Sequence, residues 1–183
     1  MQLCDIDDIK IINNFISTED LDIFNKEIHI LRSNNLIKRS KFGGRIMTEN
    51  VNIPSLLPLF KKYNKKIIDT QKTLFSITKN ISAVEVFVSI FEPGDYISDH
   101  IDSDGSFSFF EYASVMYLND FESGEICFPL LNFKYKPLAG DLILFPCNGK
   151  KSLHNTLTSK DERITVASWY GFFEKGLIKC LEE

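Results

Sequence analysis

Three side chains in the C-terminal half of this sequence have the types and spacing of a mononuclear metal site. His100 and Asp102 are separated by one residue, and a second histidine, His154, lies further along the chain. Residues two apart on a β-strand share a face, so an imidazole nitrogen and a carboxylate oxygen at positions 100 and 102 can reach one ion. Two histidines and one carboxylate form a facial triad, which leaves adjacent positions open on Fe(II). These residues predict a non-haem iron site.

Taken alone, a His-x-Asp pair is weak evidence, because a chain of 183 residues can contain one by chance. The remaining histidine, His29, falls within a predicted helix, where we expect a surface or half-buried residue rather than a ligand. The four cysteines are scattered without a CxxC pair, which argues against a zinc site or a disulfide framework and favours reduced thiols in the cytoplasm. We interpret two of them, Cys127 and Cys147, as core or turn residues.

Arg163 adds a second chemical group to the metal residues. It follows His154 by nine residues and comes after the charged turn 159–162, at the start of an apolar run that ends near Tyr170. If two antiparallel strands flank that turn, Arg163 returns to the neighbourhood of the metal. A guanidinium there would pair bidentately with a dicarboxylate whose other end chelates the ion. A surface arginine after a charged turn is the simpler interpretation if Arg163 is considered alone.

The elements that position these residues are read from hydrophobic periodicity. From Ile81 onward, strand-like alternation and short apolar runs are separated by turn dipeptides such as Pro93-Gly94 and Ala139-Gly140, which is typical of a sandwich or a barrel. The sequence predicts strands at 84–91, 96–101, 112–118, 126–128, 142–145 and 165–173.

The N-terminal part has a different pattern. Residues 9–16 are apolar enough for a first strand, and Ser17 with the acids after it predicts the start of a helix that runs to about Ser33. A second helix is expected to open at Pro54. We therefore predict one domain over residues 1–183, with a helical support region at 1–80 and a β core at 81–175.

Composition excludes several classes of protein. The apolar fraction of 44% and the charged fraction of 25% are ordinary for a globular domain. No run approaches the roughly 18 apolar residues of a membrane span, and no secretory signal is visible. The net charge of −4 hides a basic stretch at residues 26–79, with 12 Lys and Arg against three acids. That stretch raises the question of an acidic or nucleic-acid partner. A solvated helical surface is the simpler interpretation, so nucleic acid is not the expected partner.

The order of motifs from Val84 to Phe173 resembles the prolyl 4-hydroxylase-like branch of the Fe(II)/2-oxoglutarate-dependent oxygenases. The matching segments are Phe91-Glu92-Pro93-Gly94, Tyr96, His100-Ile101-Asp102, Tyr117-Leu118-Asn119-Asp120, Ser123-Gly124-Glu125, Pro137-Leu138-Ala139-Gly140-Asp141, His154, Arg163 and Trp169-Tyr170. The resemblance covers about half of the chain closely and nearly all of it loosely.

The resemblance implies a fold and a set of cofactors. The fold would be mainly β, a double-stranded β-helix (jelly roll) buttressed by two or more N-terminal helices. The cofactors would be Fe(II), 2-oxoglutarate as cosubstrate and O2, with ascorbate as a stimulant, and the products would include succinate and CO2. His100, Asp102 and His154 match the iron ligands, and Arg163 matches the residue that binds the distal carboxylate of 2-oxoglutarate.

The resemblance also assigns weaker roles. Tyr117 matches a tyrosine that hydrogen-bonds the same carboxylate, and Trp169 matches an aromatic residue near the site. Phe91 stands where many members have a tyrosine, so a hydroxyl that could contact cosubstrate or substrate is missing. Ser123 replaces the first glycine of the usual Gly-Gly-Glu turn. Tyr96 is a candidate for the substrate mouth, with plain packing as its alternative.

The expected reaction is hydroxylation of an unactivated C–H, with a prolyl residue of a peptide or protein as the preferred substrate. Fold and triad do not set the substrate. A free amino acid or another small molecule remains an alternative substrate, and a non-catalytic jelly-roll module that binds a ligand remains an alternative function.

Overall fold

The computed structural model describes residues 3–6, 8–39, 45–47, 53–173, 178 and 181. Two α-helices are present in these ranges, α1 (Thr18–Ser33) and α2 (Leu57–Leu74). The strands are β1 (Leu3–Ile6), β2 (Ile9–Ile12), β3 (Lys38–Arg39), β4 (Arg45–Met47), β5 (Ser82–Phe91), β6 (Ile97–His100), β7 (Tyr112–Tyr117), β8 (Ile126–Phe128), β9 (Phe133–Tyr135), β10 (Leu142–Pro146), β11 (His154–Thr156) and β12 (Arg163–Gly171). Short 3-10 helices cover Gly105–Phe107, Pro129–Leu131 and Lys150–Ser152.

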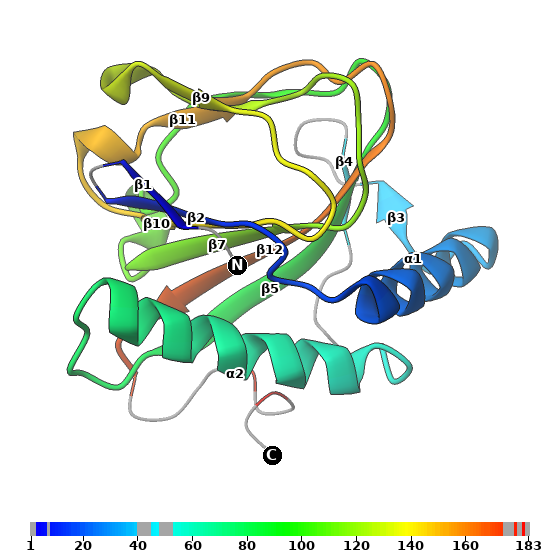
Figure 1. Cartoon of the computed structure of the whole chain (residues 1–183), viewed down its shortest axis with the longest axis horizontal. Helices are drawn as coiled ribbons and strands as arrows, with labels where there is room; N and C mark the ends of the chain where they lie inside the picture. The colour runs from blue at the N-terminus through cyan, green and yellow to red at the C-terminus, as the bar shows by residue number, and fades with distance from the viewer. Residues whose placement is uncertain are drawn as a thin grey trace.

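The strands form two antiparallel sheets. The large sheet has the order β1-β2-β10-β7-β12-β5-β4-β3, and the small sheet has the order β6-β11-β8-β9. Helix α2 runs beneath the large sheet, and the small sheet lies above the large sheet (Figure 1). The prediction of a mainly β fold supported by two N-terminal helices is confirmed.

Helix α1 begins and ends where the sequence predicts. The Ser17 side chain accepts a hydrogen bond from the backbone N–H of Asp20 at 3.3 Å, which satisfies one of the free donors of the first turn. The buried positions Asp20, Phe24 and Ile28 recur every four residues, so that one face of the helix packs on the core.

Helix α2 begins later than predicted. Pro54 is exposed and lies in a turn, and the helix starts at Leu57 with Pro58 in its first turn. Pro58 suits that position because the first-turn N–H groups have no intrahelical partner. The helix packs one face on the core, where Phe60, Tyr63 and Ile67 are all at most 3% exposed.

Strand β5 shows how alternation assigns side chains to two environments. Val86, Val88 and Ile90 pack into the core between the large sheet and the helices. Ser89 and Phe91 point to the opposite side, toward the small sheet, and line a cavity there. Both faces of the strand are buried, so the predicted period of two decides which side chains reach the cavity.

The first predicted strand, residues 9–16, is wrong in its extent. Strand β2 ends at Ile12, and Asn14 adopts a left-handed conformation with φ of 53°. The Asn13 side chain donates hydrogen bonds to Asp141 and Tyr135, which turns the chain away from the sheet. Strand β2 also joins the large sheet beside β10, a non-local pairing that local periodicity does not reveal.

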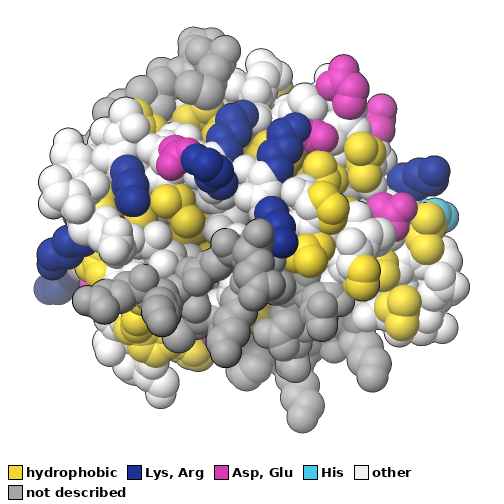
Figure 2. Space-filling model, turned by 90° about the horizontal axis from the view of Figure 1, so that it is seen from below, with side chains coloured by type: hydrophobic (Ala, Val, Ile, Leu, Met, Phe, Trp, Pro, Cys, Tyr) yellow, Lys and Arg dark blue, Asp and Glu magenta, His cyan; other side chains and the backbone are white. Residues whose placement is uncertain are grey.

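The face that carries α2 is shown in Figure 2. Lys and Arg side chains are spread over it, with acidic and hydrophobic side chains between them. Lys62 pairs with Asp20 and Lys65 pairs with Asp69, so part of the positive charge of residues 26–79 is neutralised locally. Residues 40–44 and 48–52 of that stretch lie outside the described ranges. In the described part of the chain, neither helix combines the length and apolar character needed to cross a membrane.

Candidate metal centre and adjoining cavity

The two histidines of the small sheet meet because their strands are paired. His100 is the last residue of β6, His154 is the first residue of β11, and the antiparallel register places them directly opposite each other. Their ring centroids are 4.2 Å apart. Asp102 follows β6 in a turn and reaches back to both rings. The structure thus brings together three residues from two segments that are more than 50 positions apart.

The geometry of this group fits a single metal ion. His100 Nε2 lies 3.4 Å from Asp102 Oδ1, and His154 Nε2 lies 3.9 Å from Asp102 Oδ2. One donor atom from each residue lies within 4.8 Å of the other two. Metal–nitrogen and metal–oxygen bonds of about 2.0–2.2 Å allow donor atoms about 3–4 Å apart around one ion. A small tightening of these side chains is therefore enough to coordinate a metal.

The backbone selects the histidine tautomer that a metal needs. His100 Nδ1 lies 2.9 Å from the carbonyl oxygen of Ser98, and His154 Nδ1 lies 2.9 Å from the carbonyl oxygen of Ser152. A carbonyl oxygen can only accept, so each Nδ1 carries the hydrogen and each Nε2 keeps its lone pair. The carboxylate of Asp99, next to His100 in the sequence, accepts a hydrogen bond from the Asn155 side chain.

Electrostatics keep the triad in its ligand form. Burial alone would raise the pKa of Asp102, but its close contacts with the imidazole rings of His100 and His154 hold that pKa below its usual value. Burial lowers the pKa of His154, so its imidazole stays neutral. A charged carboxylate and neutral imidazoles are the forms that bind a metal.

Aromatic side chains enclose the centre. The ring of His154 packs against Phe128 and Phe145, with centroid distances of 5.7 and 4.8 Å. Trp169 lines the cavity on the side of the large sheet, and its indole N–H helps to lower the pKa of Asp102. That N–H makes no hydrogen bond of good geometry within the described residues.

Arg163 is a buried cation at the other end of the same cavity. It is 1% exposed, and its Cζ atom lies 4.1 Å from the ring centroid of Phe91 and 5.8 Å from that of Phe121. Its guanidinium donates to the Gly124 carbonyl and to Thr156 Oγ1, the latter at 3.1 Å. In the described part of the chain, no carboxylate forms an ion pair with it. A buried guanidinium with spare donors fits an anion that is brought by a ligand.

Gly124 is required for this placement. It has φ of 108°, and a Cβ atom at this position would lie 2.8 Å from Arg163 Nη1 and 3.0 Å from Ser159 Cβ. A larger residue would push the guanidinium out of its site.

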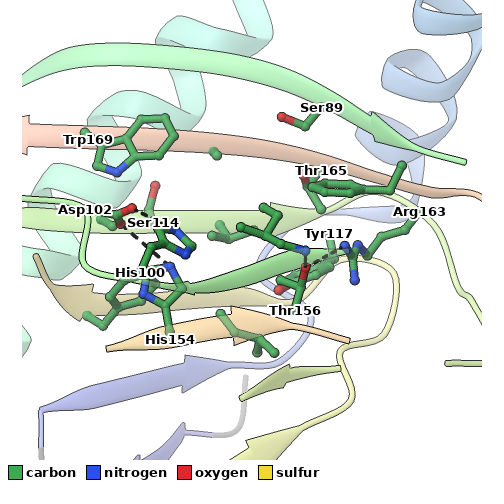
Figure 3. Close-up of a pocket in the computed structure, with 17 residues that line it drawn as sticks. Ser89, His100, Asp102, Ser114, Tyr117, His154, Thr156, Arg163, Thr165 and Trp169 are labelled. Carbon is green, nitrogen blue, oxygen red and sulfur yellow. Dashed lines mark hydrogen bonds and ion pairs between the residues drawn. The ribbon is translucent and has the colours of Figure 1, made fainter. Parts of the chain in front are cut away.

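The cavity runs between the two sheets and connects both groups. Figure 3 shows His100, Asp102 and His154 at one end and Arg163 with Tyr117 and Thr156 at the other. The lining residues are Ser89, Phe91, Ile97, His100, Asp102, Ala113, Ser114, Val115, Tyr117, Ile126, Phe145, His154, Thr156, Arg163, Thr165, Ala167 and Trp169. Most are apolar, and the polar ones cluster at the two ends and on one row of the large sheet.

The other candidate residues from the sequence, Tyr117, Phe91 and Tyr96, differ in their position relative to the cavity. Tyr117 is 2% exposed, lines the cavity and faces Arg163 closely enough to affect its pKa. Phe91 covers Arg163. Tyr96 is 58% exposed and lies outside the cavity, in a groove formed with residues 97–99 and 155–158, whereas Ile97 lines the cavity itself.

Sequence reasoning did not single out the hydroxyl side chains of the cavity, Ser89, Thr156 and Thr165. A signal for them existed. Each lies two residues from a residue that was singled out (Phe91, His154 and Arg163), and strand alternation places such pairs on one face.

The fold is shared with solved structures. No family model matches the chain, and no curated protein is similar to it in sequence at a significant level. A prolyl-4-hydroxylase from Pseudomonas putida superposes with a TM-score of 0.74 at 15% identity, over 91% of this chain and 93% of that chain. The viral collagen prolyl hydroxylase from Paramecium Bursaria Chlorella virus-1, in its 2OG complex, superposes with a TM-score of 0.71 at 23% identity. The superposition covers 91% of this chain and 97% of that chain.

A third structure is a prolyl hydroxylase from Trichoplax adhaerens in complex with a peptide fragment of the hypoxia inducible factor oxygen degradation domain. It superposes with a TM-score of 0.72 at 16% identity, over 90% of this chain and 84% of that chain. At these identities the comparisons establish the fold.

Proposed function

We propose that this chain is an Fe(II)- and 2-oxoglutarate-dependent dioxygenase that hydroxylates an unactivated C–H bond. The proposal includes a double-stranded β-helix as the core and one domain over residues 1–183. It assigns His100, Asp102 and His154 as the iron ligands and Arg163 and Tyr117 as the residues that hold the far carboxylate of 2-oxoglutarate. The thiols of Cys127 and Cys147 are free, in keeping with our proposal of a reducing, cytoplasmic location.

One observation carries this proposal. The same cavity is lined at one end by three potential metal ligands and at the other end by a buried guanidinium. Among the described residues, this guanidinium has no carboxylate partner. A ligand with a chelating group at one end and a carboxylate at the other satisfies both. 2-Oxoglutarate has this structure, since a keto acid chelates through two oxygens and the second carboxylate lies at the far end of a short chain.

When bound, the iron and the keto acid would supply oxidation of a C–H bond by O2, with succinate and CO2 as co-products. The chain's own residues do the rest. Arg163 and Tyr117 orient the keto acid, and the apolar walls that Phe145 and Trp169 contribute exclude water from the reacting atoms. The Ser98 and Ser152 carbonyls fix both imidazole rings through Nδ1 and thus hold the ligand geometry.

We propose a prolyl residue of a peptide or protein as the substrate. The support is the likeness to a collagen prolyl hydroxylase and to a prolyl hydroxylase that was solved with a peptide fragment. A ligand-binding module without turnover fits less well, because a facial triad leaves open positions on the metal beside a carboxylate clamp. A free amino acid or another small molecule would use the same iron site, and the experiment below distinguishes these substrates.

The test is a mass-spectrometric screen of proline-containing peptides, free amino acids and the protein alone, with Fe(II), 2-oxoglutarate, O2 and ascorbate. We expect a gain of one oxygen in a prolyl peptide, matched by equimolar succinate. Oxygen gain in a free amino acid alone would replace the substrate assignment. If neither hydroxylation nor any Fe(II)-dependent succinate formation occurs, the proposed function is wrong.

A further inference from the structure

Ser89 is a buried serine whose hydroxyl points into the cavity. It lies on β5 between Phe87 and Phe91, and alternation along the strand turns it away from the helix-facing core residues Val88 and Ile90. The residue is 2% exposed and lines the cavity, as Figure 3 shows. Within the described residues, its Oγ atom has no hydrogen-bond partner.

Ser89 belongs to a row of hydroxyl side chains that crosses three adjacent strands. Thr165 on β12 is the register partner of Ser89, and Tyr117 on β7 is the register partner of Thr165. All three line the cavity. Neighbouring strands are about 4.8 Å apart, so a ligand that lies across the row contacts more than one hydroxyl.

The row lies next to the buried guanidinium. On the same face of the sheet, the pair next to Ser89 and Thr165 consists of Phe91 on β5 and Arg163 on β12. Each of these residues lies two positions from its neighbour in the row. In the other direction, β12 leads through Ala167 to Trp169 and the metal ligands. Ser89 therefore lies between the carboxylate clamp and the metal centre, where a keto acid that spans the cavity would pass.

The energetics of an unpaired hydroxyl favour a ligand-binding role. A buried O–H group without a partner destabilises the fold, and an alanine of nearly the same shape would avoid this cost. The ring of Phe91 lies against Arg163 and supplies no hydroxyl to the clamp. Ser89, on the same face of the same strand, supplies one.

We propose that Ser89 binds the cosubstrate, with its Oγ–H donating a hydrogen bond to the far carboxylate of the keto acid beside Thr165 and Arg163. This inference rests on the proposed function and adds a hydroxyl donor to the group that holds the far carboxylate.

The test is calorimetric binding under anaerobic conditions to the Fe(II)-loaded protein, with 2-oxoglutarate, N-oxalylglycine and oxalate as probes. Oxalate chelates a metal but is too short to reach the clamp. For Ser89→Ala we expect the Kd of 2-oxoglutarate and N-oxalylglycine to rise about tenfold, the effect of one charge-assisted hydrogen bond, while the Kd of oxalate is unchanged. The melting temperature of the ligand-free variant should equal or exceed that of the wild type, because an unpaired hydroxyl is removed.

Ser168→Ala is the matched control. Ser168 is a buried serine on β12, 3% exposed, whose side chain lies on the opposite face of the large sheet. Its substitution should leave all three dissociation constants unchanged.

The outcomes separate this inference from the proposed function. In one outcome the wild type binds 2-oxoglutarate and Arg163→Ala weakens this binding, but Ser89→Ala leaves it unchanged. The proposed role of Ser89 is then wrong, and the proposed function stands. If Ser89→Ala weakens oxalate equally and lowers the melting temperature, Ser89 is structural and the inference is also wrong. A wild type that does not bind 2-oxoglutarate overturns both.

Discussion

The ring of Phe91 covers the guanidinium of Arg163, with Arg163 Cζ 4.1 Å from the ring centroid. The two residues are register partners on β5 and β12, so the contact is fixed by the sheet itself. The sequence shows only that a hydroxyl is missing at position 91. The structure shows that the aromatic face has another use, since it desolvates a buried cation and stabilises it through its quadrupole.

Replacing Phe91 by leucine removes this cation–π contact while it keeps an apolar side chain. We expect a loss of about 1–2 kcal/mol in the free energy of unfolding and a several-fold rise in the Kd of 2-oxoglutarate, because the guanidinium is less well fixed. Urea unfolding and calorimetry measure the two effects. Phe87→Leu, on the same face of β5 but packed on Trp169, is the control and should leave cosubstrate affinity nearly unchanged. Equal affinity losses in both variants would contradict the prediction.

Gly124→Ala should displace Arg163. The new Cβ atom would meet Nη1 at 2.8 Å in a backbone with φ of 108°. We expect a loss of stability of about 1–3 kcal/mol and a KM for 2-oxoglutarate that rises at least tenfold. Gly149→Ala is the control, because Gly149 also has positive φ, 87°, but open space around its Cβ position. The Gly149→Ala variant should lose stability through backbone strain alone. An unchanged KM for 2-oxoglutarate in Gly124→Ala would show that the carboxylate clamp does not depend on Gly124.

Arg163→Ala should raise the KM for 2-oxoglutarate by about two orders of magnitude or more, since the variant loses a buried charge pair with the ligand. Metal binding should persist, because none of the three metal residues contacts Arg163 through a hydrogen bond or ion pair in the described structure. Steady-state kinetics and a metal titration measure the two quantities. Unchanged KM would refute the clamp.

Asp102→Ala should abolish tight Fe(II) binding and succinate formation together. The substitution removes the carboxylate of the group, whose oxygen atoms lie near both Nε2 atoms. His100→Ala should have the same effect. His29→Ala is the control, because His29 is exposed on α1 and lies outside the group. Full turnover in Asp102→Ala would remove this residue from the site.

Asp20 on α1 accepts hydrogen bonds from side chains of α2, and low pH should weaken this contact between the helices. Burial opposes ionisation of this carboxyl, but hydrogen bonds from Lys62 and Tyr63, at 2.5 and 2.6 Å, and from the Ser17 side chain hold its pKa below the ordinary 3.8. The folded state thus binds this proton less readily than the unfolded state. The stability that Asp20 contributes is complete above the unfolded pKa and is lost as the pH falls through the lower folded value.

Asp20→Asn should therefore cost about 1–3 kcal/mol at pH 7 and reduce the slope of stability against pH below about pH 4. Urea unfolding between pH 3 and pH 7 measures both. The exposed pair that Lys65 forms with Asp69 provides the comparison, and Asp69→Asn should change stability by less than about 1 kcal/mol. An unaltered acid slope in Asp20→Asn would mean that other carboxylates dominate acid unfolding.

The sequence by itself determined the elements with strong local signals. The Ser17 cap and the four-residue spacing of Phe24 and Ile28 predict α1, and alternation predicts β5. The residue types and spacing of His100, Asp102, His154 and Arg163 by themselves indicate a site. These features depend on neighbours in the chain, and local geometry is nearly the same in any fold.

Only the tertiary structure decided which strands meet and what faces the cavity. The pairing of β6 with β11 aligns His100 with His154, and the register of β5, β12 and β7 aligns Ser89, Thr165 and Tyr117. It also leaves Tyr96 outside the cavity and adds β2 to the large sheet. Register between distant strands follows from the packing of whole faces, since a shift by one residue would turn every side chain to the other side.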